Sequence, residues 1–421
     1  MSVGLAKVWR RTLRNRNDTN QRLCIITHSG YPVEPRARRM AEALTARGYR
    51  VDVLCLRLSD QPAEEIVNGV RVMRLPVTRH QGAGPLMYLA EYVRFFLLAA
   101  WRLGALHRRH PYALVQVHNP PDALVFCTLP LKLSRVPVIL DLRELTPELF
   151  MSRFGLARHS AVVRILTVLE RWACRYANAA LVLHERHRRI MTGRGIPDAR
   201  LTEVMNCPDE RVFDPTKTPL SRDGLPLGQH AADGKFVVIH HGGMMQRYGV
   251  DLLVRALASV RDQIPGLQLE LYGTGDFRPE IERMVAELGL ADIVNLHGQQ
   301  PLELIPPAIA AADVGVAPMR QDIFTDCGLP TKLLEYVALG IPGVASRTAT
   351  TADYFDDSMV QFFRPGDAAD LAEKLLVLYR DPVAAQAQAA RARRFTEAHN
   401  WPGERARYLD LVDRLTGAQC Y

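Results

Sequence analysis

The segment GLPTKLLEYVALG, residues 328–340, combines the residue types that an anion-binding helix start requires. Pro330 precedes a run with helical apolar spacing, and Thr331 is placed to cap its first turn. The exposed amide groups and the positive end of the helix dipole suit a diphosphate, and Lys332 adds a positive charge there. One turn further on, Glu335 can accept hydrogen bonds from the two hydroxyls of a ribose. The alternative is an ordinary amphipathic helix with Glu335 in solvent, which apolar periodicity alone favours.

Short β-rich runs alternate with helical stretches along the chain, which is typical of parallel sheets wrapped in helices. Strands are expected at 23–28, 51–56, 113–118, 136–141, 179–183 and 201–205, and then at 235–240, 267–272, 292–296, 313–317 and 341–346. The pattern lapses at 214–234, a segment rich in Pro, Gly and Asp, which is the best candidate for a linker. The sequence therefore predicts an α/β protein with two doubly wound, Rossmann-like domains, whose ligands bind beyond the carboxyl ends of the strands.

With 421 residues, of which 48% are hydrophobic, the chain is long enough for two domains of roughly 200 residues each. The formal net charge is +8, and residues 1–22 contribute much of it, with six basic residues against one aspartate. A basic arm at 1–21 can bind anionic lipid or nucleic acid, or it is a solvated, frayed terminus. Because the basic excess is confined to this arm and no recognition motif accompanies it, nucleic-acid binding is the least favoured function.

The seven cysteines are scattered, without a CxxC pair or the spacing of metal ligands. This argues for a reducing compartment and against a disulfide framework or a zinc site. The most apolar run, residues 95–106, contains Arg102 and is shorter than the about 20 residues that a membrane span needs. No apolar signal core follows the basic N-terminus. The prediction is a cytoplasmic protein that is either free or peripheral on the inner face of the membrane.

Residues 330–346, PTKLLEYVALGIPGVAS, resemble the donor-site segment of the family-4 retaining glycosyltransferases, which have the GT-B fold. In that family a glutamate of this segment binds the donor ribose, and the resemblance gives this role to Glu335. A second glutamate usually stands eight residues earlier; here that position is Cys327, with Asp326 beside it. For the contact to the donor sugar the resemblance therefore leaves two alternatives, namely Asp326 or backbone amide groups.

Other segments of the second half resemble the same family. HHGGMMQRYGVDLL, residues 240–253, is similar to the loop and helix start of the donor domain, where glycines let the backbone approach a phosphate. The family's usual Arg and Lys positions fall on a glycine and a tyrosine here, so Arg247 is the candidate for the phosphate charge. The alternative is a tight turn with Arg247 exposed. LYGTGDF, residues 271–277, resembles the strand-end G-x-G turn, and LHGQ, residues 296–299, resembles the loop near the nucleotide base.

The resemblance thus implies a donor site built mainly by the second half of the chain. The expected donor-binding residues are Gly30, Gly242, Gly243, Arg247, Gly273, Gly275, His297, Asp326, Gly328, Leu329, Pro330, Thr331, Lys332 and Glu335. Within this set Arg247, Lys332 and Glu335 are expected to be catalytic. The implied donor is a UDP- or GDP-linked sugar. Neither a metal ion nor another cofactor is expected, because fixed cationic groups and amides can stabilise the departing diphosphate.

In the first half, residues 27–54 resemble the family's opening strand, loop and helix, and residues 117–125 match a segment at the cleft between the domains. Residues 205–215 resemble the segment that leads into the linker, and Trp401 stands where the family starts a helix that crosses back to the first domain. The acceptor-side candidates on this resemblance are His28, Tyr31, His118, Asn119 and Arg143. For His28 the alternative is a packed, neutral side chain.

Arg143 marks a departure from the family pattern. Many relatives place a histidine shortly after the strand expected at 136–141, and here Arg143 precedes Glu144. Retaining transfer in this family is thought to proceed on the front face of the sugar, with the departing phosphate accepting the acceptor's proton, so that a protein base is dispensable. Arg143 then either binds an anionic acceptor or forms a salt bridge with Glu144 or Glu148.

Residues 85–110 form a long, aromatic segment that ends in basic residues. Phe95, Phe96 and Trp101, together with residues 107–110, are expected either to form a surface for a lipid-linked acceptor or to belong to a buried helix of the first domain.

The resemblance runs collinearly from about residue 22 to residue 416 and implies a metal-independent, retaining hexosyltransferase. Its partners would be a nucleoside diphosphate sugar, a glycan or lipid-linked saccharide acceptor, and an anionic membrane surface touched by the arm. The expected division is an arm at 1–21, an acceptor-side domain at 22–213, a linker at 214–234, a nucleotide-sugar domain at 235–400 and a returning helix at 401–421. Two alternatives remain open: a sugar-nucleotide epimerase on the same fold, and a non-catalytic sugar-nucleotide-binding partner of another transferase.

Overall fold

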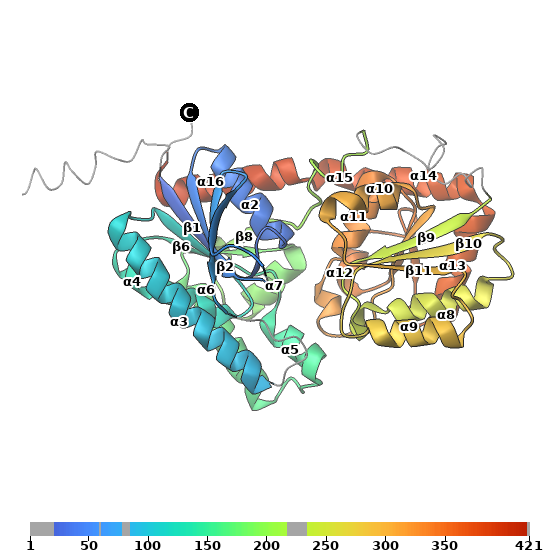
Figure 1. Cartoon of the computed structure of the whole chain (residues 1–421), viewed down its shortest axis with the longest axis horizontal. Coiled ribbons are helices and arrows are strands. Elements are labelled where there is room, and N and C mark those ends of the chain that lie inside the picture. The colour runs from blue at the N-terminus through green and yellow to red at the C-terminus, as the bar shows by residue number, and fades with distance from the viewer. Residues whose placement is uncertain (1–20, 59, 78–84, 217–233, 419–421) are drawn as a thin grey trace, which may run out of the picture. The chain divides into compact units, whose positions relative to one another are not determined.

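The computed structural model describes residues 21–418, except residue 59, residues 78–84 and residues 217–233. The predicted arm, apart from its last residue, and most of the predicted linker lie outside the described residues. The chain divides into two compact units. The N-terminal unit contains residues 1–205 and 404–421, and the C-terminal unit contains residues 206–403. Figure 1 shows that each unit has its own sheet and its own helices, which confirms the predicted α/β architecture with two parallel sheets.

The N-terminal unit contains an eight-stranded sheet of order β3-β4-β2-β1-β5-β6-β7-β8. Its strands are β1 (Arg22–Gly30), β2 (Arg50–Leu56), β3 (Glu64–Val67), β4 (Val70–Leu75), β5 (Leu114–His118), β6 (Val138–Asp141), β7 (Ala179–Val182) and β8 (Leu201–Glu203). Within this sheet β3 pairs antiparallel with β4, and the other neighbours are parallel. The central strands are buried on both faces, as parallel strands covered by helices must be.

Seven α-helices belong wholly or mainly to this unit in the described part of the chain. They are α2 (Pro35–Ala46), α3 (Pro85–Arg109), α4 (Leu129–Leu133), α5 (Thr146–Phe154), α6 (Ala161–Tyr176), α7 (Glu185–Gly193) and α16 (Trp401–Thr416), with the 3-10 helices η1 (Asp122–Thr128) and η2 (Asp198–Arg200). In Figure 1, α2 and α16 lie above this sheet and α3 runs diagonally below it. None of the described helices is long and apolar enough to cross a membrane.

Strand β3 and strand β4 were not predicted, and together they form a hairpin at the edge of the sheet. Its two-residue turn is Asn68-Gly69, in which both residues have positive φ, 50° and 79°. This pair is a strong hairpin signal. Charged residues on the solvent side, such as the ion-paired Glu64 and Arg71, broke the apolar pattern that marks the other strands.

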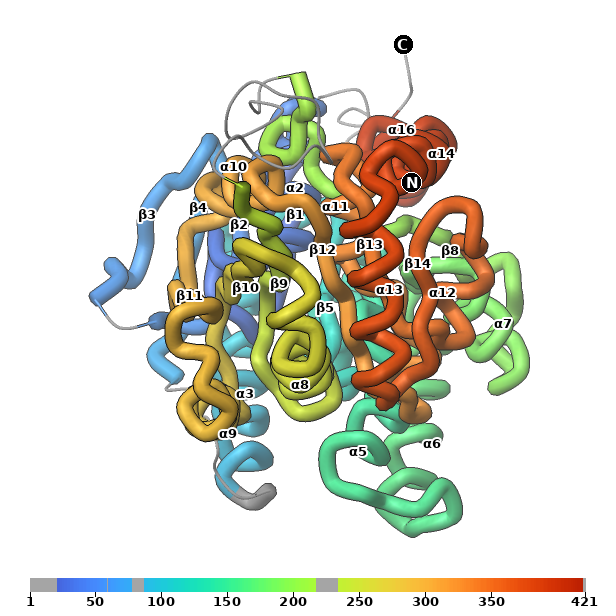
Figure 2. Tube along the Cα trace, turned by 90° about the vertical axis from the view of Figure 1, so that its right-hand side faces the viewer, coloured from blue at the N-terminus to red at the C-terminus, as the bar shows by residue number. Residues whose placement is uncertain are grey.

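The C-terminal unit contains a six-stranded, fully parallel sheet of order β11-β10-β9-β12-β13-β14. Its strands are β9 (Phe236–His241), β10 (Leu267–Tyr272), β11 (Val294–Gly298), β12 (Val314–Ala317), β13 (Gly343–Ser346) and β14 (Gln361–Phe363). In Figure 2, where this unit faces the viewer, the strand labels run from β11 on the left to β14 on the right in this order. The short strand β14 was not predicted.

Helices cover both faces of this second sheet. They are α8 (Val250–Val260), α9 (Arg278–Glu287), α10 (Ile305–Ala310), α11 (Thr331–Leu339), α12 (Ala349–Tyr354), α13 (Ala368–Arg380), α14 (Pro382–Arg393) and α15 (Phe395–Ala398), with the 3-10 helices η3 (Gln246–Tyr248), η4 (Leu302–Leu304) and η5 (Thr325–Cys327). Apolar residues of β9, β10, α8, α9 and α13 form one continuous buried core, which fixes the positions of the strand ends.

The loops that follow β9, β10 and β11 are tied to one another by backbone hydrogen bonds. The amide of Gly242 donates to Tyr272 O at 2.9 Å, that of Met244 to Thr274 O at 2.9 Å, and that of Gly273 to Gly298 O at 2.7 Å. Gly273 has φ of 128°, and a Cβ atom on it would lie 1.9 Å from Gly242 O. Only glycine therefore fits at this crossing, and the three loops are held in one arrangement.

We expect Gly273→Ala to lower the free energy of unfolding by about 3 kcal/mol, because the new Cβ meets backbone and the conformation is strained. Gly366→Ala is the matched control, since Gly366 also has positive φ, 85°, but nothing lies within 4 Å of its added Cβ. Strain alone should cost about 1 kcal/mol there. Urea unfolding followed by circular dichroism compares the two, and equal losses would contradict the role given to the loop crossing.

Candidate functional site

Helix α11 begins at Thr331 without a side-chain cap. The prediction that Thr331 caps the helix is wrong, because Thr331 is already the first helical residue and Pro330 occupies the cap position in an extended conformation. The amides of Leu333 and Leu334 donate to Pro330 O at 3.1 and 3.4 Å. Within the described residues the amides of Thr331 and Lys332 have no hydrogen-bond partner. The start of α11 therefore presents two unused donors and the positive end of its dipole.

Lys332 directs a buried ammonium group toward the end of β9. Its Nζ lies 3.4 Å from Nε2 of His240 and 5.2 Å from the centre of the Tyr248 ring. The same Nζ would lie 3.6 Å from a Cβ placed on Gly242. Burial lowers the pKa of Lys332 to about 8, partly offset by the negative charge of Glu335. Lys332 therefore remains mostly protonated at neutral pH, although it is buried.

His240 explains how the structure accommodates this buried ammonium group. It is fully buried, and its Nδ1 lies 2.9 Å from Val316 O, a carbonyl that can only accept a hydrogen bond. Burial, and then the charge of Lys332, hold the pKa of His240 well below its usual value. The ring is therefore neutral, with its proton on Nδ1 and the lone pair of Nε2 facing Lys332. Sequence reasoning missed His240, although it ends a predicted strand.

Arg247 lies on η3, close to Lys332. Its guanidinium group stacks over the rings of Tyr248 and Phe324 at 5.3 and 5.5 Å, and its Nη2 lies 3.0 Å from Met245 Sδ. It forms no ion pair with any acid in the part of the chain that the structure describes. The ring of Tyr248 thus has both Arg247 and Lys332 against it, so two cations without an acidic partner lie at one place.

Glu335 lies one turn along α11 from Thr331, beside the end of β9. Its Oε2 is 3.0 Å from Nε2 of His241, and both side chains are largely buried. No described residue donates a hydrogen bond to its other oxygen, Oε1. The ring of His241 packs edge-on against Tyr336. Glu335 therefore points back toward the strand end, and its Oε1 has no donor among the described residues, so that it can accept a further hydrogen bond.

The loop before α11 contains Asp326 and Cys327, which lie where the resemblance expects a contact to the sugar. The Asp326 carboxylate accepts from the Ala349 amide at 3.0 Å and from Gln321 Nε2 at 3.1 Å. Cys327 Sγ lies 3.2 Å from Ile323 O. The Asp326 carboxylate thus ties its loop to the start of α12, and Gly328, which has an extended backbone, leads through Leu329 to α11.

His297 lies at the end of β11, where the resemblance expects a contact to the base. Its ring stacks on Tyr272 with centres 4.3 Å apart and planes at 12°, and it is paired with Glu270. The predicted Gly273 and Gly275 separate it from the loop of Gly242 and Gly243. Both glycines lie against that loop, since a Cβ on Gly273 would meet Gly242 O at 1.9 Å and one on Gly275 would meet Met244 O at 2.3 Å.

Of the acceptor-side candidates, His28 is packed. Its ring lies 4.6 Å from that of Tyr92 and 4.9 Å from that of Phe95, and its Nε2 is 3.2 Å from Glu91 Oε1 on α3. Tyr31 is fully buried, and its carbonyl accepts from Arg74 at 3.0 Å. A Cβ on Gly30 would meet the side chain of Leu58. These residues form part of the packing between β1, α3 and β4.

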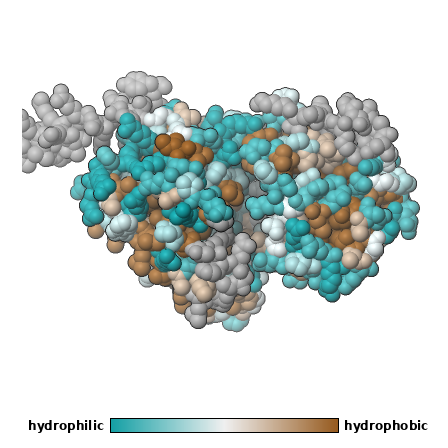
Figure 3. Space-filling model, viewed as in Figure 1, coloured by the Kyte–Doolittle hydropathy of each residue, from teal (hydrophilic) through white to brown (hydrophobic). Residues whose placement is uncertain are grey.

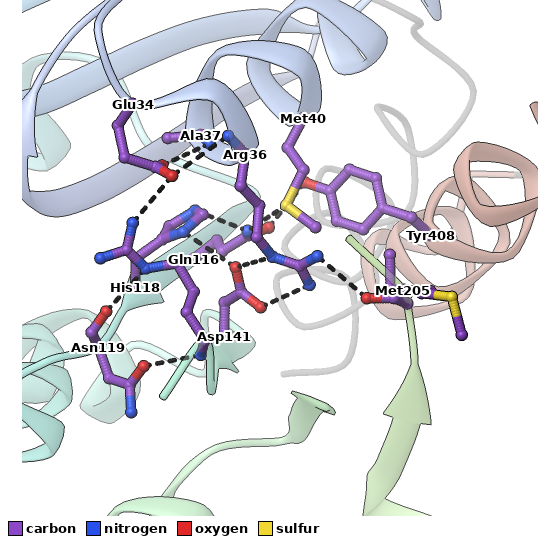
Figure 4. A network of polar contacts seen from close by, with 12 residues as sticks. Glu34, Arg36, Ala37, Met40, Gln116, His118, Asn119, Asp141, Met205 and Tyr408 are labelled. Carbon is purple, nitrogen blue, oxygen red and sulfur yellow. Dashed lines mark hydrogen bonds and ion pairs between the residues drawn. The ribbon is translucent and has the colours of Figure 1, made fainter. Parts of the chain in front are cut away.

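His118 belongs to a buried polar network at the ends of β5 and β6 (Figure 4). Its Nδ1 lies 2.9 Å from Asp141 Oδ2, and its Nε2 lies 3.0 Å from Gln116 Nε2. Arg36 holds Asp141 by two hydrogen bonds of 2.8 Å, and Tyr408 on α16 donates to Gln116 at 2.7 Å. Burial opposes ionisation of Asp141, but Arg36 and His118 hold the pKa of its carboxyl well below the usual value. The polar groups of this network are therefore bonded mainly to one another.

Asn119 and Arg143 support each other and the turn after β6. Asn119 Oδ1 accepts from the Arg143 amide at 2.8 Å, and Asn119 O accepts from Arg143 Nε at 2.9 Å. Arg143 Nη1 lies 2.9 Å from Glu34 Oε1, so its salt bridge is with Glu34 and not with the predicted Glu144 or Glu148. Sequence spacing could not indicate this partner, since Glu34 precedes α2. Arg143 keeps a fifth of its side chain exposed, whereas Asn119 is fully buried.

Two family descriptions match this chain. Residues 33–207 match the glycosyl transferase 4-like domain, and residues 235–381 match the glycosyl transferases group 1. Together these matches cover most of both units, in the order of that two-domain family. The chain therefore belongs to this family of glycosyltransferases and has the GT-B fold. Within the described residues, no group of three or more His, Cys, Asp or Glu is placed to hold a metal ion.

Curated relatives are similar over parts of the chain. Sulfoquinovosyl transferase SQD2 of Arabidopsis thaliana is 25% identical over 67% of this chain and 53% of its own length. A GDP-mannose-dependent alpha-(1-6)-phosphatidylinositol monomannoside mannosyltransferase of Mycolicibacterium smegmatis is 30% identical over 52% of this chain and 57% of its own. Alpha-D-kanosaminyltransferase of Streptomyces kanamyceticus is 26% identical over 80% of this chain and 89% of its own length. The chain thus spans little more than half the length of the first two.

Two solved structures show the same fold. Sucrose-phosphate synthase from Thermosynechococcus elongatus has a TM-score of 0.74 and 20% identity, covering 95% of this chain and 100% of that one. HepE of Anabaena in complex with UDP-glucose has a TM-score of 0.69 and 15% identity, covering 94% of this chain and 100% of that one. At this identity the likeness concerns the fold alone.

We expect Asp141→Asn to lower the free energy of unfolding by about 3–5 kcal/mol, because it leaves the buried Arg36 charge without its partner. Asp198→Asn is the control in the same unit, since Asp198 pairs with Arg188 at the surface. That change should cost much less, because solvent screens this exposed pair. Urea unfolding measures both, and similar losses would show that the network contributes no more than a surface pair.

Proposed function

We propose that this chain transfers a hexose from a UDP- or GDP-linked sugar to a hydroxyl of a glycan or lipid-linked saccharide, with retention of configuration and without a metal ion. The observation that carries the proposal is the convergence of Lys332, Arg247 and two unused amides at the start of α11. All three kinds of group favour an anion, and none is neutralised by an acid of the described chain. A diphosphate matches them in charge and in its number of acceptor oxygens.

In the proposed complex the diphosphate binds at the start of α11, between Lys332 and Arg247. Glu335 then accepts hydrogen bonds from the ribose hydroxyls through its Oε1, which has no hydrogen-bond partner in the described chain. The backbone of Gly242 and Gly243 lets the donor approach Lys332 without steric hindrance, since a side chain on Gly242 would meet Lys332. The base would lie toward His297, whose ring and that of Tyr272 form a stacked pair.

The proposed catalysis is electrostatic. When the bond between the anomeric carbon and the phosphate oxygen breaks, negative charge develops on the departing diphosphate, and the fixed cations and amides stabilise it. The acceptor oxygen bonds to the same face of the carbon, and its proton passes to the departing phosphate oxygen. No protein base is needed in this scheme, which agrees with the internal partners of His118 and Arg143. The relatives support a sugar donor, since one is GDP-mannose-dependent by name and HepE was solved with UDP-glucose.

The decisive experiment is a donor and acceptor panel. The protein is incubated with UDP- and GDP-hexoses in the presence of EDTA, and nucleotide release is followed with and without a polyprenyl-linked saccharide. We expect release that depends on the acceptor and a product with retained configuration. Turnover without acceptor would instead identify an epimerase or hydrolase, and binding without any turnover a non-catalytic partner.

Glu335→Gln tests the placement of the ribose. We expect it to weaken donor binding by about 1.5–3 kcal/mol, since a neutral amide replaces a charged acceptor of hydrogen bonds. Glu282→Gln, on the exposed face of α9, is the control and should bind donor normally. Isothermal titration calorimetry with the nucleoside diphosphate measures both. Normal binding by Glu335→Gln would show that the ribose lies elsewhere.

Lys332 gives the donor site a pH dependence. Because its pKa is about 8 in the free protein and a bound anion must raise it, the affinity for a nucleoside diphosphate should be nearly constant below pH 7, fall about twofold by pH 8 and weaken further above pH 8. Between pH 7 and 9 the dissociation constant should rise about tenfold. Calorimetry at these pH values tests this, with Lys332→Met as the comparison. An equally steep rise in Lys332→Met would assign the effect to another group.

A further inference from the structure

The outward face of α3 is apolar. Leu89, Val93, Leu97 and Trp101 follow one another at intervals of four residues, so they lie along one line of the helix. All four side chains are exposed, Trp101 by 65%. A helix that packs on a sheet normally places polar residues on this side. Phe95, for which the sequence left a surface or a buried position open, is buried and faces the core.

Helix α6 also has an exposed apolar stripe. Val162, Ile165, Val168 and Trp172 are spaced three and four residues apart and are exposed, Trp172 by 59%. The inner face of α6 contains the buried Glu170. Isolated exposed apolar residues need no explanation, but two helices with continuous apolar stripes do.

An apolar groove lies between α3 and α6. A cavity of about 350 Å³ is lined by Leu89 and Val93 of α3, by Leu166 and Leu169 of α6, and by Phe154 of α5. A second, shallower depression lies on the other side of Val93, toward Leu97. We call the outward sides of α3, α5 and α6 with this groove the α3–α6 face. In the view of Figure 3, brown surface gathers at the lower left, where α3 runs in Figure 1.

Within the chain segment that forms the α3–α6 face, the fully exposed charges are positive. Between residues 87 and 176 the acids Glu91, Asp122, Asp141, Glu148 and Glu170 are buried, and Glu144 is half-buried. The exposed side chains in the same stretch include the arginines Arg94, Arg108, Arg109, Arg135, Arg153, Arg158, Arg164 and Arg175. An acidic residue is thus never fully exposed there. The face thus combines apolar side chains with an excess of positive charge, and Glu64 of β3, which pairs with Arg102 of α3, is an exposed acid beside it.

This combination selects among the possible occupants. A second copy of the chain would bring the same positive charges against this face, which disfavours association. An anionic lipid bilayer instead offers negative headgroups to the arginines and hydrocarbon to the leucines and valines. Tryptophan is favoured at the boundary between the two. An acyl chain can also enter the apolar groove.

We propose that the α3–α6 face binds the surface of an anionic lipid bilayer, with Trp101 and Trp172 at the level of the headgroups and upper acyl chains. This site is distinct from the basic arm, to which the sequence alone assigned the membrane contact. The proposal is independent of the transfer reaction, because binding to vesicles needs neither donor nor acceptor. It would bring the N-terminal unit to lipid-linked acceptors where they reside.

The test is binding of the full chain to vesicles. We expect co-sedimentation with an equal mixture of phosphatidylcholine and phosphatidylglycerol, and little with phosphatidylcholine alone. Brominated acyl chains should quench the tryptophan fluorescence of the bound protein. Trp101→Phe/Trp172→Phe should remove that quenching, because Trp401 is buried in the C-terminal unit, and Trp9→Phe should retain it. The proposal would be overturned if the protein bound the vesicles but its quenching did not depend on Trp101 or Trp172.

Matched variants separate this face from other surfaces. Arg94→Glu/Arg164→Glu should weaken binding to the mixed vesicles at least about tenfold, since each basic residue near an anionic surface contributes about 1 kcal/mol. Val377→Ser/Val383→Ser, which changes exposed valines of the C-terminal unit, should have no effect. Arg10→Glu/Arg11→Glu/Arg14→Glu should leave the quenching in place. Binding abolished by the arm variant but unchanged in Arg94→Glu/Arg164→Glu would assign the contact to the arm and refute the proposal.

Discussion

The ammonium group of Lys332 is buried between a neutral histidine, an aromatic ring and a glycine, and it has no acidic partner at ion-pair distance among the described residues. Such a group is unfavourable in a folded protein unless something compensates its charge. In the N-terminal unit the corresponding strand ends also contain a buried charge, Asp141, and there Arg36 neutralises it directly. The two sheets thus differ at the same edge. One has complete internal compensation, and the other gives its buried ammonium group no acidic partner among the described residues, which is why we propose this place for the donor diphosphate.

Much of the proposed donor site could be predicted from the sequence, because its signals are local. The proline before α11, the position of Lys332 one residue into the helix and that of Glu335 one turn later all lie within a few residues of one another. His240 and Tyr248 could not be assigned in this way. Their roles depend on contacts with Lys332, which is more than eighty residues away in the chain, and no spacing rule links them. The helix start itself was predicted, but the absence of a cap was not, because Thr331 is as suitable for the first helical position as for the cap.

The acceptor half illustrates the opposite case. His118, Asn119 and Arg143 are residue types that bind ligands, and they follow strands, as the fold rule requires. In the structure their polar atoms are engaged by Asp141, Asp122 and Glu34. Two of these partners lie at least twenty residues from the residue they bind, so the sequence could not show that the candidates were already satisfied. The apolar period of α3 was equally ambiguous, because periodicity identifies a stripe without indicating whether the sheet or the solvent lies against it.

The crossing of Gly242, Gly273 and Gly298 affects more than the stability of the C-terminal unit. The amides of Gly242, Met244 and Gly273 are used within the crossing itself. A ligand at this edge meets loops whose conformational freedom was already lost during folding, so little further ordering entropy opposes its binding there. Association at this surface should therefore resemble the docking of a ligand into a rigid receptor more than the closing of a flexible loop over it. The enthalpy and entropy of binding would then report mainly on desolvation and ion pairing.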